Sequence, residues 1–169
     1  MNQFKVIRPE EISKNAFELL GKDWTLITAK KGDKVNTMTA SWGGVGVFWG
    51  ADVVYIFVRQ TRYTKEFIDA SDEFSLTFFN PDQYRKTLSY LGKVSGRTED
   101  KITKAGLTVV EQNGIPFFEE ADMAILCKKV GQYYIDPKGI LDETVIPKWY
   151  ADNNYHDMYI GKIIEVLKK

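Results

Sequence analysis

The chain has 169 residues, a mass of 19.4 kDa and 44% hydrophobic residues, which suits one compact domain over residues 1–169. Its 23 basic and 23 acidic side chains give a formal net charge of zero, which argues against partners such as nucleic acid or an anionic membrane. No apolar run approaches the roughly 20 residues of a membrane-spanning helix, and a single cysteine without a secretory signal pattern predicts a cytoplasmic location.

The first predicted elements are a helix and a β-hairpin. Pro9 followed by two glutamates is typical of a first helical turn, and apolar residues continue at helical spacing until Gly21. Two β-rich runs, 24–29 and 35–42, then flank a charged turn that contains Gly32.

Strands and helices are predicted to alternate through the middle of the chain. Three glycines within residues 43–46 favour a turn, because glycine tolerates positive φ. The segments that follow are a central strand at 53–58, a helix at 65–70, a strand at 74–79, a helix at 82–91 and a polar loop at 92–101. A hydroxyl of Thr61 or Thr64 could cap the first of these helices, and Asn80-Pro81 is typical of a helix start.

The remainder of the chain is mostly β-strand. The predicted elements are strands at 107–111 and 116–118 around the turn Asn113-Gly114, a long strand at 121–134, a helical turn at 146–153 and a closing strand at 157–167. Strands joined mainly by hairpins, with a few short helices outside, predict a mainly β fold: a partly closed antiparallel β-barrel.

One candidate binding segment is the strand at 36–42, which ends in small hydroxyl side chains and an aromatic ring. Small side chains let a planar ligand approach backbone N–H groups, and polar side chains add hydrogen bonds. The residues concerned are Asn36, Thr37, Met38, Thr39, Ala40, Ser41 and Trp42. An ordinary half-buried strand with one polar face is the alternative.

A second candidate segment lies between the central strand and the following helix. Guanidinium groups and hydroxyls are strong phosphate donors, and a helix N-terminus adds its own N–H groups. The residues concerned are Arg59, Thr61, Arg62, Tyr63 and Thr64. A solvated helix start with surface ion pairs is the alternative. Together the two segments suit a phosphorylated planar ligand such as flavin mononucleotide (FMN).

A loop and the single histidine are further candidates. Lys93, Ser95, Arg97 and Lys101 lie in a glycine-containing loop that could surround an anion, contact a neighbouring subunit, or simply be exposed. His156 could donate a hydrogen bond to a flavin or nicotinamide, or carry a proton, since its ordinary pKa is about 6.5. An inert position at the start of a strand is the alternative for this histidine.

Other common sites lack their motifs in this sequence. There is no Gly-x-Gly-x-x-Gly, no Walker-type phosphate loop and no histidine or cysteine set with metal-binding spacing. A Rossmann dehydrogenase, a P-loop enzyme and a metal site are therefore disfavoured. Cys127 has no partner for redox chemistry and is expected to be a small buried hydrophobic residue.

The order of the candidate segments resembles the flavin reductase-like family of FMN-binding split barrels, which includes flavoredoxin. The segments are Asn-x-Met-Thr-Ala-Ser-Trp at 36–42, Val-Arg-x-x-Arg-x-Thr at 58–64, Ser-Gly-Arg-x-x-Asp-Lys at 95–101 and His-x4-Gly at 156–161. The resemblance spans about residues 12–166. It implies a six-stranded antiparallel split β-barrel that forms a homodimer, with FMN held noncovalently near the subunit interface.

The resemblance also implies roles for the candidate residues. Residues 36–42 would border the isoalloxazine ring and ribityl chain, residues 59–64 would surround the phosphate with Lys93 and Ser95, and His156 would lie near the flavin face. The implied activity is an oxidoreductase that passes electrons from NADH or NADPH through FMN to free flavin or a partner protein. A flavoredoxin-type carrier without a nicotinamide site is the alternative, and a non-catalytic module for haem or another planar cofactor is a third.

Overall fold

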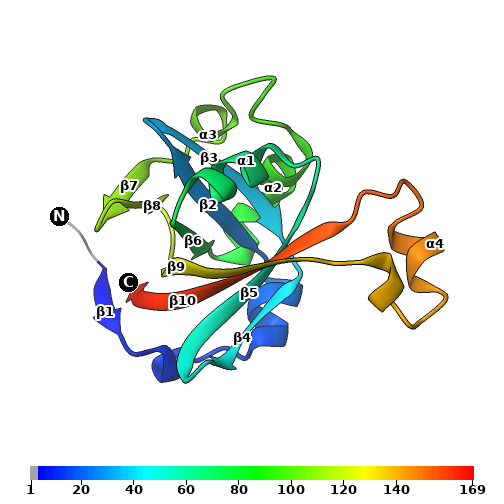
Figure 1. The fold of residues 1–169 in the computed structure, drawn as a ribbon. Helices are drawn as coiled ribbons and strands as arrows, with labels where there is room; N and C mark the ends of the chain where they lie inside the picture. The colour runs from blue at the N-terminus through cyan, green and yellow to red at the C-terminus, as the bar shows by residue number, and fades with distance from the viewer. Residues whose placement is uncertain (1–3) are drawn as a thin grey trace.

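The computed structural model describes residues 4–169 and consists of a β-barrel, flanking helices and a projecting arm (Figure 1). The main sheet is antiparallel and follows the order β3-β2-β6-β9-β10-β5-β4, with β1 added to β10. Its strands are β1 (Lys5–Ile7), β2 (Thr25–Lys31), β3 (Lys34–Ala40), β4 (Gly43–Phe48), β5 (Ala51–Arg59), β6 (Glu73–Phe78), β9 (Met123–Tyr134) and β10 (His156–Lys168). A separate two-stranded sheet pairs β7 (Val109–Gln112) with β8 (Ile115–Phe118).

The predicted mainly β, antiparallel split-barrel class is confirmed. The main sheet has eight strands where six were expected, because the short β1 and the glycine-rich β4 also join it. The helices are the 3₁₀ turn η1 (Pro9–Glu11), the π-helix η2 (Phe17–Lys22), α1 (Tyr63–Ala70), α2 (Pro81–Lys93), α3 (Lys101–Lys104), the 3₁₀ turn η3 (Pro137–Gly139) and α4 (Val145–Trp149). Within residues 4–169, none of them is long and apolar enough to cross a membrane.

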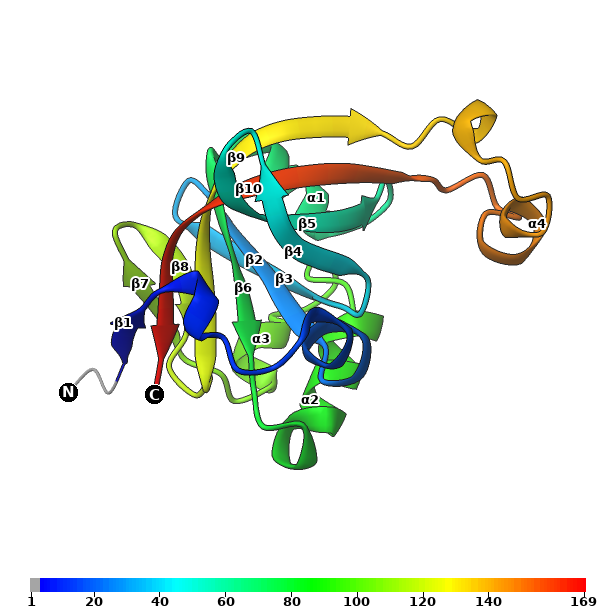
Figure 2. The same cartoon turned by 90° about the horizontal axis from the view of Figure 1, so that it is seen from below.

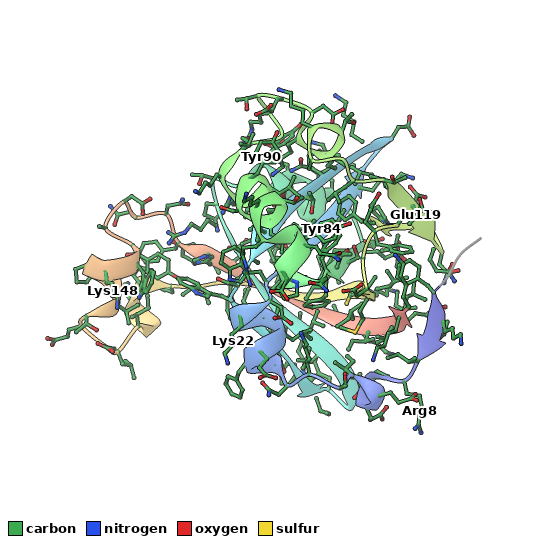
Figure 3. The ribbon with its side chains drawn as sticks, turned by 180° about the vertical axis from the view of Figure 1, so that it is seen from behind. Arg8, Lys22, Tyr84, Tyr90, Glu119 and Lys148 are labelled. Carbon is green, nitrogen blue, oxygen red and sulfur yellow. The ribbon has the colours of Figure 1, made fainter. Side chains whose placement is uncertain are left out.

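Between β9 and β10 the chain leaves the barrel as an arm, which comprises residues 135–155 and contains η3 and α4. Both views of the ribbon show β9 and β10 running side by side toward this arm (Figures 1 and 2). In the view from behind, Lys148 lies on the arm, well away from Tyr84 and Tyr90 of α2 (Figure 3). The arm therefore has a large surface that its own barrel does not cover.

The largest hydrophobic cluster fills the barrel with side chains from its long strands, among them Ile27, Ile56, Leu76 and Ile125. Full burial of one such side chain stabilises the fold by about 1.5–3 kcal/mol. Cys127 belongs to this cluster, as expected, and burial raises the pKa of its thiol. A second cluster lies under the α2 region and is formed by Leu26, Phe79, Leu88, Leu91, Leu107, Phe118 and Ala121.

Two predicted elements begin where local side chains indicate. The Asn80 side chain accepts a hydrogen bond from the Asp82 N–H at 3.0 Å, so α2 starts at Pro81 as predicted. Asn113 and Gly114 have φ angles of 54° and 80°, and they form the two-residue turn between β7 and β8. Each signal acts within a few residues, which is why the sequence is sufficient to place these two elements.

The predicted turn at residues 43–46 is wrong, because these residues begin strand β4. Gly43 pairs with Ile56 and Gly46 with Val53 on β5. Gly43 has a φ of 147°, and a Cβ there would lie 2.5 Å from the Tyr55 carbonyl oxygen. Glycine is thus needed for close approach between two strands rather than for a reversal of the chain.

The predicted helix from Pro9 to Gly21 is also wrong in extent. It divides into η1 and η2, because Ile12 is extended, with φ −66° and ψ 111°. Ile12 packs against the barrel core, and Leu19 and Leu20 are buried from the second piece. The apolar spacing that suggests one helix therefore serves two separate contacts with the core.

The predicted threonine cap of α1 is not formed. Arg62 occupies the N-cap position without a side-chain hydrogen bond to the helix. Thr64 lies inside the first turn, and its hydroxyl accepts a hydrogen bond from Asn36 Nδ2 at 2.8 Å. The threonine next to the arginines is therefore directed across to β3, which brings two of the candidate segments together.

Candidate functional site

Two adjoining cavities lie where β3, β5 and β10 meet the start of α1, and they share Met38 and Arg62. The first has a volume of about 240 Å³ and is lined by Met38, Thr39, Ala40, Ser41, Trp42, Phe57, Arg59, Arg62, Trp149 and His156. The second has a volume of about 170 Å³ and is lined by Asn36, Met38, Thr61, Arg62, Tyr63, Thr64, Lys93, Val94, Ser95, Gly96 and Lys101. Taken together, they fall in the range of roughly 300–1,000 Å³ that is typical of small-molecule sites.

The first cavity has aromatic walls and a floor of small residues. The Trp42 and Trp149 rings meet edge to face at 5.0 Å between centroids, and the His156 ring lies 5.5 Å from Trp42. Trp42 is 41% exposed and Trp149 is 43% exposed, so the cavity opens to solvent beside them. The combination of flat aromatic side chains with small neighbouring residues suits a planar ring.

Arg59 holds the arm against this cavity. Its guanidinium donates to the carbonyl oxygens of Asn154 at 2.7 Å and Trp149 at 2.9 Å. The Asn154 side chain in turn donates to Thr61 Oγ1 at 2.7 Å. The structure therefore directs the Arg59 guanidinium to the arm, whereas the sequence had grouped it with the phosphate donors.

The second cavity collects positive charge and hydroxyl groups. Arg62 donates from Nη1 to the Gly92 carbonyl oxygen at 2.6 Å, and Thr64, Ser95 and Lys101 line the same space. A Cβ at position 96 would collide with the Asn36 side chain, so only glycine lets the loop close here. In the part of the chain that is described, no aspartate or glutamate lines either cavity. Arg59 of the first cavity pairs with Asp152, but among residues 4–169 the second cavity's Arg62, Lys93 and Lys101 have no ion-pair partner, so the second cavity favours a bound anion.

His156 is buried in the wall of the first cavity, opposite Arg59 in the β5–β10 register. Its Nδ1 shares a hydrogen bond of 2.7 Å with the Tyr150 hydroxyl of the arm. Burial, with smaller contributions from Arg59 and Arg62, lowers the pKa of His156 to about 4. The imidazole is therefore neutral near pH 7 and acts there as a hydrogen-bonding group rather than as a cation.

The structure brings together the predicted site residues except Thr37 and Arg97. Arg97 lines neither cavity, and its guanidinium pairs with Glu66. The Thr37 side chain is buried on the other face of β3, where its hydroxyl contacts Thr28 Oγ1 at 2.9 Å and the Ile27 carbonyl oxygen at 3.1 Å. Thr28 is the cross-strand partner of Thr37 on β2, so the Thr37 hydroxyl is used within the sheet. The cavity residues that sequence reasoning did not select are Phe57, Val94, Gly96 and Trp149; of these, Gly96 belongs to the recognised segment 95–101.

The family model described as flavin reductase like domain matches residues 18–168, so the chain belongs to that family. The resemblance found in the sequence is thereby confirmed, and the family supports FMN as a cofactor. No curated protein matches the chain.

Several solved structures share the fold. An FMN-binding domain of a flavin reductases-like enzyme from Shewanella baltica OS155 has a TM-score of 0.70 and 18% identity, and the match covers 99% of this chain and 78% of that one. Flavoredoxin of Desulfovibrio vulgaris (Miyazaki F) has a TM-score of 0.69 and 22% identity, with 96% and 77% covered. Flavoredoxin from Methanosarcina acetivorans has a TM-score of 0.68 and 23% identity, with 87% and 68% covered. At these identities the matches establish the fold.

Proposed function

We propose that this protein binds FMN noncovalently and transfers electrons from NADH or NADPH through it to free flavin or a partner protein. The observation that carries the proposal is the junction of the two cavities at Met38 and Arg62. One cavity suits a planar ring, and the next offers cations and hydroxyls without a carboxylate. FMN has this same division between a tricyclic ring and a phosphomonoester.

The proposed contacts follow the two cavities. The isoalloxazine ring would lie against the β3 residues, with Trp42, Trp149 and His156 around it. The phosphate would lie among the donors of the second cavity, namely Asn36, Thr61, Arg62, Tyr63, Thr64, Lys93 and Ser95. Arg59 would contribute indirectly, because it holds the Trp149 carbonyl and thus the arm.

When bound, FMN supplies the hydride and electron chemistry, so the protein needs no acid or base of its own. Its residues bind the phosphate, hold the ring and leave one side of the ring open. A third cavity of about 490 Å³ adjoins the first through Ser41 and Trp42 and is walled by Phe17 and Leu20. This space beside the proposed ring position supports a second planar molecule, such as a nicotinamide, as the electron donor.

The alternative is a flavoredoxin-type carrier, in which bound FMN is reduced by another protein and no nicotinamide binds. Two of the similar structures are flavoredoxins, and this observation keeps the alternative open. Both functions require the same FMN site. They differ in whether a nicotinamide can reduce it.

Anaerobic mixing of the FMN-loaded protein with NADH or NADPH tests the proposal. We expect the yellow flavin absorbance to disappear at a rate that depends on nicotinamide concentration, because hydride reaches the ring directly. Bound FMN that stays oxidised until a redox protein is added would instead support the carrier. A protein that binds other planar dyes as well as FMN, or that shows a Soret band as purified, would contradict both.

We also propose that residues 1–169 form one domain and that two copies associate as a homodimer in the cytoplasm. The arm supports the dimer, because Leu141 is 91% exposed there and Tyr133 and Tyr134 are exposed at its base. Such a surface is typical of a subunit contact. Residues 1–3 of the proposed domain lie outside the described residues.

If the flavin site depends on the second copy, dilution is expected to release FMN and dissociate the dimer together. Light scattering for mass and flavin fluorescence for release, followed over the same dilution series, provide the measurement. A monomer that retains FMN at full occupancy would contradict this arrangement.

A further inference from the structure

Lys101 is a buried ammonium group beside the second cavity. It begins α3 and is 3% exposed. Its Nζ donates to the carbonyl oxygens of Leu91 at 2.8 Å and Val94 at 2.9 Å, at the C-terminal end of α2. A lysine ammonium has three donors, so these two neutral acceptors leave one N–H without a partner among the described residues.

The charge of Lys101 is not balanced by a carboxylate. No ion pair within residues 4–169 includes it. The two neighbouring acids are engaged elsewhere: Glu99 pairs with Lys104, and Asp100 accepts from the Thr103 N–H at 3.2 Å. The charged cavity neighbours of Lys101 are Arg62 and Lys93, which carry the same sign. A buried cation in such surroundings is costly unless an anion joins it.

The surroundings of Lys101 point to the kind of anion. The second cavity, which Lys101 lines, also contains the amide of Asn36 and the hydroxyls of Thr64 and Ser95. Its volume of about 170 Å³ suits a small anion. We infer that Lys101 makes this cavity specific for a doubly ionised phosphate, and that those molecules in which Lys101 is neutral take up a proton from water as the phosphate binds. The inference rests on the proposed function, since the phosphate is that of FMN.

The expected pH dependence follows from the state of Lys101 before binding. Burial, reinforced by the Arg62 charge, lowers the pKa of Lys101 to about 8. A bound dianion stabilises the ammonium form and raises that pKa again. The lysine therefore binds a proton together with FMN above pH 8, and FMN affinity falls as the pH rises through this range.

The other charged and titratable groups around Lys101 are Arg62, Lys93, Asp100 and Tyr90. Arg62 stays charged, Lys93 is exposed to solvent, hydrogen bonds from Thr103 lower the pKa of Asp100, and burial raises the pKa of Tyr90. The phosphate itself loses its second proton near pH 6, and selection of the dianion there releases a proton rather than taking one up. Proton uptake by Lys101 and proton release by the phosphate therefore differ in sign and in the pH at which they occur.

Isothermal titration of the full chain with FMN and with riboflavin, in buffers of different ionisation enthalpy, tests this inference. With FMN we expect uptake of about 0.1 proton at pH 7 from the lysine, rising to about 0.9 at pH 9. With riboflavin we expect no uptake at either pH. FMN binding without proton uptake at pH 9 would overturn the inference but leave the proposed function intact.

Two substitutions separate charge from structure. Lys101→Met is expected to abolish the uptake and to weaken FMN by roughly 10- to 100-fold, the value of a charged hydrogen bond, with little change for riboflavin. Lys104→Met, three residues along the same helix at an exposed position, is the matched control and should bind FMN as the wild type does. If Lys101→Met does not fold, the number of protons that the wild type takes up on binding FMN still tests the inference. Failure of the wild type to prefer FMN over riboflavin would instead refute the proposed function.

Discussion

Replacement of Arg62 by alanine is expected to weaken FMN binding by roughly 10- to 150-fold while changing riboflavin binding by only a few-fold. Arg62 lines both cavities, and its Nη1 is fixed by the Gly92 carbonyl oxygen at 2.6 Å. A charged hydrogen bond to phosphate contributes about 1.5–3 kcal/mol, and riboflavin has no phosphate to lose. Equilibrium fluorescence titration of both ligands measures the difference.

Arg59→Ala is the informative control for this prediction. The sequence pattern assigned both arginines to the phosphate, but the structure engages the Arg59 guanidinium with two arm carbonyls. Its loss should free the arm and Trp149, and so weaken FMN and riboflavin to a similar degree. If Arg62→Ala weakens FMN and riboflavin binding equally, the phosphate contact assigned to Arg62 is contradicted. If Arg59→Ala weakens FMN binding selectively, that contact belongs to Arg59 instead.

Replacement of Lys65 by methionine is expected to destabilise the flavin-free protein by about 3–5 kcal/mol. The Lys65 ammonium lies 2.8 Å from carboxylate oxygens of both Asp157 and Asp69, and 2.9 Å from the Tyr159 hydroxyl. Lys65 and Asp157 are buried, so the variant would leave Asp157 as a buried carboxylate without its cation. Urea unfolding measures the loss of free energy.

Two further variants show whether loss of the Lys65–Asp157 ion pair causes the lower stability of Lys65→Met. Lys30→Met breaks a half-exposed pair with Glu111 of similar length, 2.7 Å, and should destabilise the protein far less than Lys65→Met, because solvent screens this pair. Lys65→Met combined with Asp157→Leu removes both charges and should recover part of the stability. A double variant no more stable than Lys65→Met would assign the loss to packing rather than to the unpaired carboxylate.

The ion pair between Lys65 and Asp157 also predicts how the destabilisation by Lys65→Met depends on pH. Burial raises the pKa of Asp157, but hydrogen bonds from Lys65, Gln132 and Gln60 outweigh it and lower the pKa overall. The carboxylate therefore stabilises the wild type above its unfolded pKa of about 3.9, and this contribution is lost as the pH falls. In Lys65→Met the burial of Asp157 without its cation raises the pKa of that carboxyl, so the deficit of the variant relative to the wild type should begin to narrow above pH 4 and continue to narrow as the pH falls.

Several parts of the fold were predictable because their causes are local. The helix start at Asn80-Pro81 and the turn at Asn113-Gly114 each depend on side chains within a few residues. The glycines at 43–46 were predicted wrongly, because glycine is used both in turns and where strands approach closely. Which use applies at Gly43 depends on Tyr55, twelve residues away on the next strand.

The candidate site was likewise predictable only in part from the sequence. The sequence alone determined the family and most of the cavity residues, since short segments such as 36–42 and 59–64 carry the small, hydroxyl and cationic side chains that line the two cavities. Only the tertiary structure decided that Arg59 holds the arm, that Trp149 completes the aromatic wall, and that Lys101 is buried without a carboxylate. The physical reason is distance along the chain: these properties depend on partners up to 95 residues away, which only the folded barrel brings together.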